Sequence, residues 1–143
     1  MVRQDLWSEE ENDVYQAILR VFELGKNRAM ELFNEAHSSQ YTRFSDLPPH
    51  GLQRGDLALR LKGSIFTELV DLQYQLRDVE IRVYGDTALA TYILEYSGVV
   101  INSYTFEGRK LNVSARCTTL LKREGGRWII EHEHFSRLEN PTF

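Results

Sequence analysis

The chain has 143 residues, and its 17 basic and 21 acidic side chains give a net charge of -4. This balance argues against nucleic acid as a main partner, because binding phosphates requires a basic surface. No apolar run approaches the roughly 18 residues of a membrane span, and the N-terminus lacks the apolar segment of a secretory signal. The length, the 42% of hydrophobic residues and the single cysteine, Cys117, predict one cytoplasmic domain over residues 1–143, without a membrane partner.

The first helix is marked by Ser8 and the three acids that follow it. Ser8 with Glu11 three residues later has the spacing of a capping box, and acids in the first turn stabilise the positive end of the helix dipole. Apolar residues then recur at helical spacing over residues 14–24. Gly25 is expected to end this helix, as glycine often does just beyond the last turn.

The remaining elements follow from changes in period and composition. In order, we expect a short helix (27–33), a strand (35–44), a loop with two prolines and two glycines (45–55), a helix (56–70), and strands over 72–83, 87–101, 111–122 and 128–137. An irregularity is expected near Arg77-Asp78, and residues 102–110 should form a turn. Helices followed by a run of strands predict the α+β class.

The last two strands should form a hairpin, because Glu124-Gly125-Gly126 supplies residues suited to a tight loop. If Lys122 faces Arg127, one face carries Arg116, Thr118, Glu133 and Phe135, and the other carries Cys117, Leu121, Trp128, Ile130, His132 and His134. We predict that the first face lines a half-polar cavity. The second face, with its apolar patch of Leu121, Trp128 and Ile130, should meet a second copy of the chain in a homodimer.

His132 and His134 share a face because alternate residues of a strand do, and imidazoles are good metal ligands. Cys117 is the one expected cross-strand neighbour that could complete a zinc site. We interpret the two histidines instead as hydrogen-bonding residues at the subunit interface, and no metal is predicted. The sequence contains no nucleotide-binding glycine loop, nucleophile elbow or CxxC pair, and no cofactor is predicted.

Three stretches, GDTALATYIL (85–94), ARCTTLLKREGGRWIIEHEHFS (115–136) and the loop from Phe44 to Gly55 that leads into a helix, carry a family resemblance. Over residues 8–137 the chain resembles the nuclear transport factor 2-like superfamily. The resemblance is strongest to SnoaL-like domains and the calcium/calmodulin-dependent kinase II association domain. It implies a cone-shaped, curved antiparallel sheet, the cystatin-like α+β roll, wrapped around the N-terminal helices. A pocket then lies between the concave face and the first and third helices, and many members dimerise through the outer face.

The resemblance also implies positions for a site. Ketosteroid isomerases of this superfamily carry a catalytic carboxylate in the loop after the first strand, where this chain has Ser45 and Asp46. Their oxyanion-hole positions correspond to Ala17, with Tyr15 nearby, and to Thr118. The pocket arginines of the kinase association domain correspond to Leu94, Thr118 or Thr119, and Phe135. This chain therefore differs from both relatives at those positions.

We predict a homodimeric domain that binds a small, partly apolar molecule. The residues expected around the ligand are Tyr15, Arg43, Tyr92, Leu94, Arg116, Thr118, Glu133 and Phe135, together with Ile18 and Phe22 from the first helix. Arg116 and Glu133 could form a ligand-binding pair or a plain cross-strand ion pair.

One alternative is a cofactor-independent isomerase, cyclase or dehydratase with Asp46 as general base. The alternative interpretation is that Asp46 initiates the turn before Pro48-Pro49, a frequent role of aspartate. A second alternative is a module that serves only to oligomerise.

Overall fold

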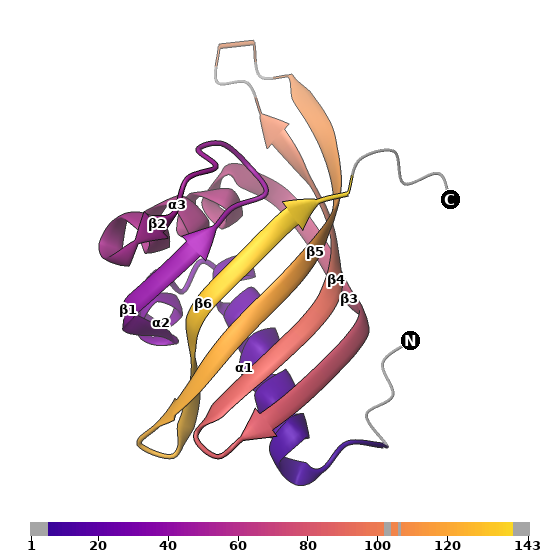
Figure 1. The fold of residues 1–143 in the computed structure, drawn as a ribbon. Helices are drawn as coiled ribbons and strands as arrows, with labels where there is room; N and C mark the ends of the chain where they lie inside the picture. Colours follow the sequence, from indigo (N-terminus) through magenta and orange to yellow (C-terminus); the bar gives the residue numbers. More distant parts are fainter. Residues whose placement is uncertain (1–5, 102–103, 106, 139–143) are drawn as a thin grey trace.

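The computed structural model describes residues 6–101, 104–105 and 107–138. Its elements are α1 (Glu9–Lys26), α2 (Met30–Glu35), β1 (His37–Phe44), β2 (Gln53–Arg54), α3 (Gly55–Glu68), β3 (Leu69–Tyr84), β4 (Thr87–Ile101), β5 (Gly108–Glu124) and β6 (Arg127–Arg137). This order confirms the predicted α+β class (Figure 1). The two-residue β2 is absent from the sequence prediction, and part of the turn predicted over 102–110 lies outside the described residues.

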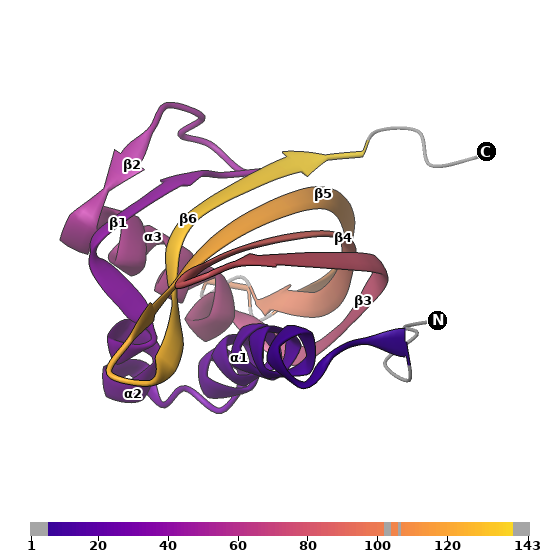
Figure 2. The same cartoon turned by 60° about the horizontal axis from the view of Figure 1, so that its bottom comes forward.

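The six strands form one sheet in the order β2-β1-β6-β5-β4-β3. β1 runs parallel to β6, and the other neighbouring pairs are antiparallel. The long strands arch over α1 (Figure 2), so the concave face of the sheet covers the helices. This arrangement confirms the predicted curved sheet wrapped around the N-terminal helices.

The core fills the space between the helices and the concave face. From α1 it includes Val14, Ile18 and Val21, all of them buried. Phe33 of α2 and Phe66 of α3 pack edge-on against each other beneath them, with ring centroids 5.4 Å apart. Across the described ranges, no helix combines the length and apolar composition that a membrane crossing requires.

α1 has a defined cap at each end. The Ser8 hydroxyl accepts a hydrogen bond from the Glu11 N–H, and the Glu11 carboxylate accepts one from the Ser8 N–H, which confirms the capping box. The predicted end at Gly25 is wrong, because the helix continues to Lys26 and Arg28 takes the left-handed conformation, with φ of 58°. Gly25 instead allows close packing, because a Cβ there would lie 2.6 Å from the Phe66 ring.

Two irregularities bend β3. Its register with β4 shifts between Val70 and Gln73 and again between Arg77 and Glu80, where Asp71 and Asp78 have positive φ. The second shift confirms the predicted irregularity near Arg77-Asp78. Because β-bulges bend a strand and increase its twist, these two features contribute to the curvature that encloses the helices.

β5 and β6 form the predicted hairpin, but the predicted register is wrong. Gly125 and Gly126 both have positive φ and make a two-residue turn, so Glu124 faces Arg127. The prediction had placed Lys122 opposite Arg127. A turn of two residues is shorter than the loop that was expected, and it moves the pairing by two residues.

A bulge in β6 then changes the register a second time. Leu121 faces Ile130 but Leu120 faces His132, so Glu131 is the extra residue on β6. Because side chains alternate between the faces of a strand, one extra residue reverses the alternation beyond it.

The bulge divides the hairpin faces differently from the prediction. Glu133 and Phe135 lie on the concave face, as predicted, and are buried. Arg116 and Thr118 were predicted to share that face, but Arg116 faces Ser136 and is exposed, and Thr118 faces the exposed His134. Both therefore lie on the outer face, and this part of the prediction is wrong.

The predicted apolar outer patch is also wrong. Leu121 and Ile130 are fully buried in the core, and Trp128 is half-buried and packs against the core. These residues lie between the turn and the bulge. In that part of the hairpin, the prediction exchanged the inward and outward faces of the sheet. If the chain dimerises through its outer sheet face, other residues must form that contact.

Candidate functional site

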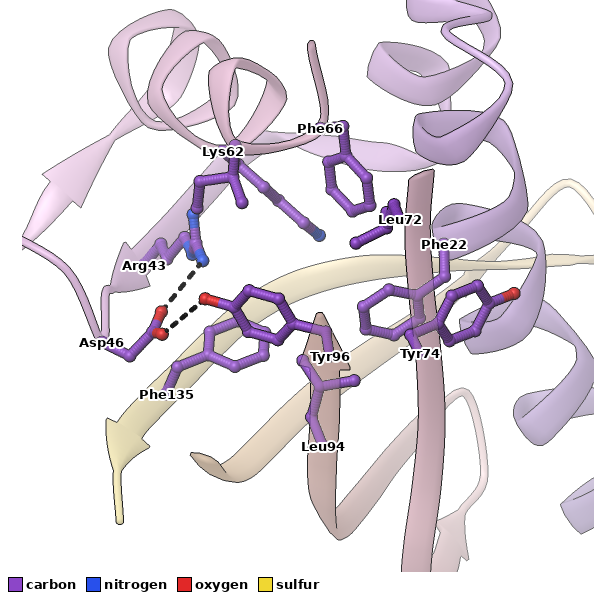
Figure 3. Close-up of a pocket in the computed structure, with 11 residues that line it drawn as sticks. Phe22, Arg43, Asp46, Lys62, Phe66, Leu72, Tyr74, Leu94, Tyr96 and Phe135 are labelled. Atoms are coloured by element: carbon purple, nitrogen blue, oxygen red, sulfur yellow. Dashed lines mark hydrogen bonds and ion pairs between the residues drawn. The ribbon is translucent and has the colours of Figure 1, made fainter. Parts of the chain in front are cut away.

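A cavity lies between the concave face of the sheet and the helices α1 and α3 (Figure 3). Its apolar wall includes Phe22 from α1, Ile65 and Phe66 from α3, and Leu72, Leu94 and Phe135 from the sheet. Three charged side chains reach it, those of Arg43, Asp46 and Lys62. The volume of about 30 Å³ would hold one or two water molecules, so a larger molecule requires that lining side chains move.

Arg43 reaches the cavity because of the alternation of β1. Tyr41 and Arg43 face the helices and are buried, whereas Thr42 and Phe44 face the other side. The Arg43 side chain is only 4% exposed. Its guanidinium carbon lies 4.7 Å from the ring centroid of Phe135, a cation–π contact that fixes the plane of the guanidinium.

The hydrogen bonds of Arg43 are incomplete. Its Nη2 lies 4.0 Å from Oδ1 of Asp46, which is an ion pair but too long for a hydrogen bond. Its Nε and Nη1 are buried and have no hydrogen-bond partner among the described residues. A buried polar atom without a partner costs about 1–3 kcal/mol, so Arg43 would be stabilised by an additional acceptor in the cavity.

Asp46 lies just after β1, in the loop that leads to β2, and is buried. Its Oδ2 accepts a hydrogen bond of 2.9 Å from the Tyr96 hydroxyl, and Nη2 of Arg137 lies 3.9 Å from the same oxygen. Burial raises the pKa of Tyr96, and the neighbouring Asp46 charge raises it further. Tyr96 therefore stays protonated and holds the carboxylate at the cavity wall.

Beside the cavity, His37, Tyr41, Lys62 and Glu133 form a buried polar cluster. Oε1 of Glu133 accepts hydrogen bonds from Nζ of Lys62 at 2.5 Å and from the Tyr41 hydroxyl at 2.6 Å. Burial would raise the pKa of the Glu133 carboxyl, but the positive charges of Lys62 and Arg43 lower it to about 2. Burial lowers the pKa of Lys62 to about 8, although Glu133 opposes that effect. At neutral pH the two groups therefore form an ionised pair.

His37 holds Lys62 from the other side. Because an ammonium group can only donate, Nε2 of His37 must accept the 2.8 Å hydrogen bond from Nζ of Lys62. Nδ1 then carries the proton and donates to the carbonyl of Phe33 at 2.7 Å. Burial, followed by the positive charge of Lys62, lowers the pKa of His37 to about 3, so the imidazole is neutral.

Comparison with known proteins identifies the family of this chain. The sequence profile of the SnoaL-like domain matches residues 12–139. The chain belongs to the SnoaL-like domain family. It matches none of the curated proteins.

Solved structures share the fold of this SnoaL-like domain at low sequence identity. A Streptomyces avermitilis protein, proposed to be a dehydratase of the nuclear transport factor 2-like family, is 18% identical over 90% of this chain and 95% of its own, with a TM-score of 0.76. A ketosteroid isomerase-like protein from Erwinia carotovora atroseptica is 17% identical over 93% and 99%, with a TM-score of 0.71. The kinase hub homology domain of Chlamydamonas reinhardtii is 19% identical over 90% and 98%, also with a TM-score of 0.71. The family match, together with these shared folds, confirms the predicted membership of the nuclear transport factor 2-like superfamily.

Four of the predicted site residues of this SnoaL-like domain lie in the cavity wall, namely Arg43, Asp46, Leu94 and Phe135. The loop after β1 brings Asp46 next to Arg43, and β4 and β6 contribute the two apolar residues. Phe22, expected from the first helix, also lines the cavity.

Four other predicted residues are buried but lie outside the wall, and one of them, Ile18, is fully buried in the core. Tyr15 packs edge-on against Trp7, with ring centroids 4.9 Å apart. The Tyr92 hydroxyl pairs with the Thr119 hydroxyl at 3.0 Å. Glu133 lies behind Lys62, which it binds. Its predicted pairing with Arg116 is wrong, because the bulge in β6 turns Glu133 to the concave face while Arg116 of β5 lies on the outer face.

Lys62, His37 and Tyr41 were not among the predicted site residues. For Lys62 a signal was present, because residues 58, 62 and 66 of α3 lie on one helical face, and that face is buried. A lysine in the middle of an apolar stripe indicates a buried partner. His37 and Tyr41 gave no comparable signal, since the strand that carries them alternates only weakly.

The zinc alternative is not supported by the geometry. Cys117 lies on the concave face opposite Phe135, whereas His132 and His134 lie on the outer side of the bulged strand. Nδ1 of His132 is hydrogen-bonded to the Thr42 hydroxyl at 2.7 Å. Within the described part of the chain, no three His, Cys, Asp or Glu side chains are grouped so as to hold a metal ion.

Proposed function

We propose that this SnoaL-like domain binds a small, partly apolar molecule in the cavity between α1, α3 and the sheet. The observation that carries the proposal is the set of three buried charged side chains, Arg43, Asp46 and Lys62, in a wall that is mostly apolar. Ligand sites typically combine an apolar wall with a few converging polar groups. A gap left by imperfect core packing would instead be lined by apolar side chains throughout.

The small volume means that binding must displace part of the wall. The aromatic side chains on the α1 side are the best candidates, because Tyr74 is only half-buried and stacks on Phe22 with ring centroids 5.1 Å apart. The Tyr74 hydroxyl donates a hydrogen bond to Glu23 at the surface. Movement of these two rings would open the cavity without disturbing the polar groups at its other end.

Filling the cavity tests the proposal. Leu94→Trp adds bulk inside the wall, whereas Leu57→Trp makes the same change at an exposed position of α3. Co-purified molecules should be sought by native mass spectrometry, and a panel of small acids, amides, alcohols and ketones by thermal shift. A ligand at ten times its Kd should add about 1.4 kcal/mol of stability, or roughly 3–6 °C in Tm. We expect this shift in the wild type and in Leu57→Trp but not in Leu94→Trp, and equal shifts in all three would exclude the cavity as the site.

A second candidate function is a cofactor-independent isomerase, cyclase or dehydratase that uses Asp46 as general base. The position of Asp46 in the cavity wall favours it, and the similar structure from Streptomyces avermitilis is itself a proposed dehydratase. If a substrate is found by screening, Asp46→Asn should lower kcat/KM by about 100-fold or more with the fold intact. Undiminished turnover in that variant would remove Asp46 as the base.

We also infer that the chain forms a homodimer through its outer sheet face. Half-buried apolar residues on that face that do not pack against the core include Phe44, Leu89, Ile93 and Leu120. Leu89 and Leu120 are cross-strand partners, and the rings of His132 and His134 lie 6.1 and 5.3 Å from that of Phe44. A connected apolar face rimmed by polar groups is typical of an interface. The similarity to kinase hub and association domains supports self-association.

A further inference from the structure

We propose that the ligand of this cavity is a small apolar acid whose carboxylate binds Arg43 and Lys62, an inference that rests on the proposed binding function. Both side chains line the same cavity and both have donors to spare (Figure 3). Nη1 of Arg43 is buried without a partner in the described part of the chain. Nζ of Lys62 has three protons, of which Glu133 and His37 accept two. The two oxygens of a carboxylate can each accept one of these free donors.

Two of the cations around the cavity already have acidic partners, since Lys62 binds Glu133 and the partly exposed Arg137 lies 3.9 Å from Asp46. Arg43 is buried and has only a long contact of 4.0 Å with Asp46, so a monocarboxylate would supply the acceptor that its free donors lack. A phosphate dianion would bring a second negative charge into a buried space, where charges are stable only when they are paired.

Asp46 does not prevent an anion from binding next to Arg43. Its Oδ2 already accepts from Tyr96 and lies near Arg137, so its charge is partly neutralised on the side away from Arg43. Charge-assisted hydrogen bonds are roughly twice as strong as neutral ones. A carboxylate would therefore use the free donors better than the carbonyl of a ketone or an amide would.

The apolar part of the ligand follows from the rest of the wall. Phe22, Phe66 and Leu72 face the charged end across the cavity, and no further charged side chain among the described residues lines it. A second carboxylate or an ammonium group on the ligand would be buried there without a partner. The predicted class is consequently a monocarboxylic acid with a short apolar chain or ring.

The experiment compares matched acids and amides. Butyrate and butyramide have nearly the same shape, and each is titrated into ¹⁵N-labelled protein with sodium chloride used to equalise ionic strength. We expect butyrate to shift the Arg43 Nε–H resonance saturably and to bind at least about tenfold more tightly than butyramide. Arg43→Gln should abolish that preference, and Arg43→Lys, which keeps the charge, should retain part of it. Arg116→Gln removes an exposed arginine from the outer face and should behave as wild type.

The outcomes separate this inference from the proposed function. If amides, alcohols or ketones bind in the cavity while acetate, propionate and butyrate do not, the binding function holds and the carboxylate assignment is overturned. Equal affinity for acid and amide, or an acid preference that survives in Arg43→Gln, also overturns it. If Arg43→Gln fails to fold, the wild-type titration and Arg43→Lys still decide the matter. Failure of every probe, acid or neutral, to bind the wild type would remove both proposals together.

Discussion

Lys62 and Glu133 form an ion pair that is almost completely withdrawn from water. Burying two charges costs several kcal/mol per ion, and Tyr41 and His37 offset part of that cost through hydrogen bonds to the same two groups. Removal of one partner alone would leave an unpaired buried charge, which typically costs about 3–5 kcal/mol. The cluster thus fixes the position of Lys62, and with it a positive charge at the cavity wall.

His37 makes the stability of the protein depend on pH. Its pKa is about 3 in the folded protein against an ordinary value of 6.5, so between these values only the unfolded chain binds the proton. Stability therefore falls as pH falls through this window, by about 1.4 kcal/mol per pH unit. Glu133 acts in the same direction at lower pH, from its ordinary value of 4.5 down to about 2.

Replacement of His37 by glutamine should remove the upper part of this pH dependence. Glutamine can donate to Phe33 and accept from Lys62 but does not titrate. We expect the free energy of unfolding, measured with urea at pH 7, 6 and 5, to fall less steeply in His37→Gln, with a difference in slope of about 1 kcal/mol per pH unit. An unchanged slope would mean that His37 is protonated in the folded protein.

At the scale of the elements, the single extra residue in β6 decides which side chains enter the cavity. The bulge at Glu131 lets Ile130 enter the core and still directs Glu133 and Phe135 inward. Without it, the alternation of β6 would place Glu133 on the outer face, away from Lys62. The cavity and its charged cluster therefore depend on an irregularity of the sheet.

Elements with an unbroken period were the most predictable. β4 has its predicted bounds, Thr87–Ile101, and its burial alternates along almost its whole length. The hairpin register was not predictable, because a bulge depends on contacts with other elements, such as the hydrogen bond of 3.0 Å from the Ile130 N–H to the Ala36 carbonyl. The two adjacent isoleucines, Ile129 and Ile130, are both buried and were the one local sign that alternation fails.

The candidate site was predictable in part. Arg43, Asp46 and Phe135 could be placed because the first strand, the loop after it and the last strand were recognised. Lys62 was missed because the helical period of α3 was traced through apolar residues only. The buried donors of Arg43 that have no acceptor among the described residues result from three-dimensional packing, and no sequence pattern indicates them.

Contact between α1 and α3 depends on Gly25. A helical Gly→Ala change usually stabilises by up to about 1 kcal/mol, but a Cβ at Gly25 would lie 2.6 Å from the Phe66 ring. That ring cannot yield easily, because it packs against Phe22 and Phe33. We expect Gly25→Ala to lower the free energy of unfolding by about 1–3 kcal/mol in urea denaturation.

Gly63 provides the matched control on α3. A Cβ there would lie 2.8 Å from the terminal methyl group of Met30, which can turn aside. Gly63→Ala should therefore be neutral or stabilise by up to about 1 kcal/mol. If Gly25→Ala also stabilised the protein, the close approach of α1 to α3 would not require a glycine at position 25.

At the scale of the whole molecule, the proposed homodimer can be tested at Leu120. Leu120→Glu places a charge at the centre of the outer apolar face, beside its partner Leu89. We expect this variant to be monomeric by size-exclusion chromatography with light scattering, at concentrations where the wild type is dimeric. Leu57→Glu makes the same change on exposed α3 and should leave the mass unchanged. A dimer that persists in Leu120→Glu would exclude this face.

The parallel pairing of β1 with β6 has a consequence for biosynthesis. β1 is made early, but its parallel neighbour β6 is made after every other described strand of the sheet. Until then Arg43 lacks the Phe135 ring on which it stacks, and Lys62 lacks Glu133. Domains generally fold as units during synthesis, and this one cannot close its binding site until translation has passed residue 137. A nascent chain released before that point would lack the β6 partners of Lys62 and Arg43, two side chains that are buried in the folded domain. We expect such a chain to be recognised by chaperones and proteases as unfolded.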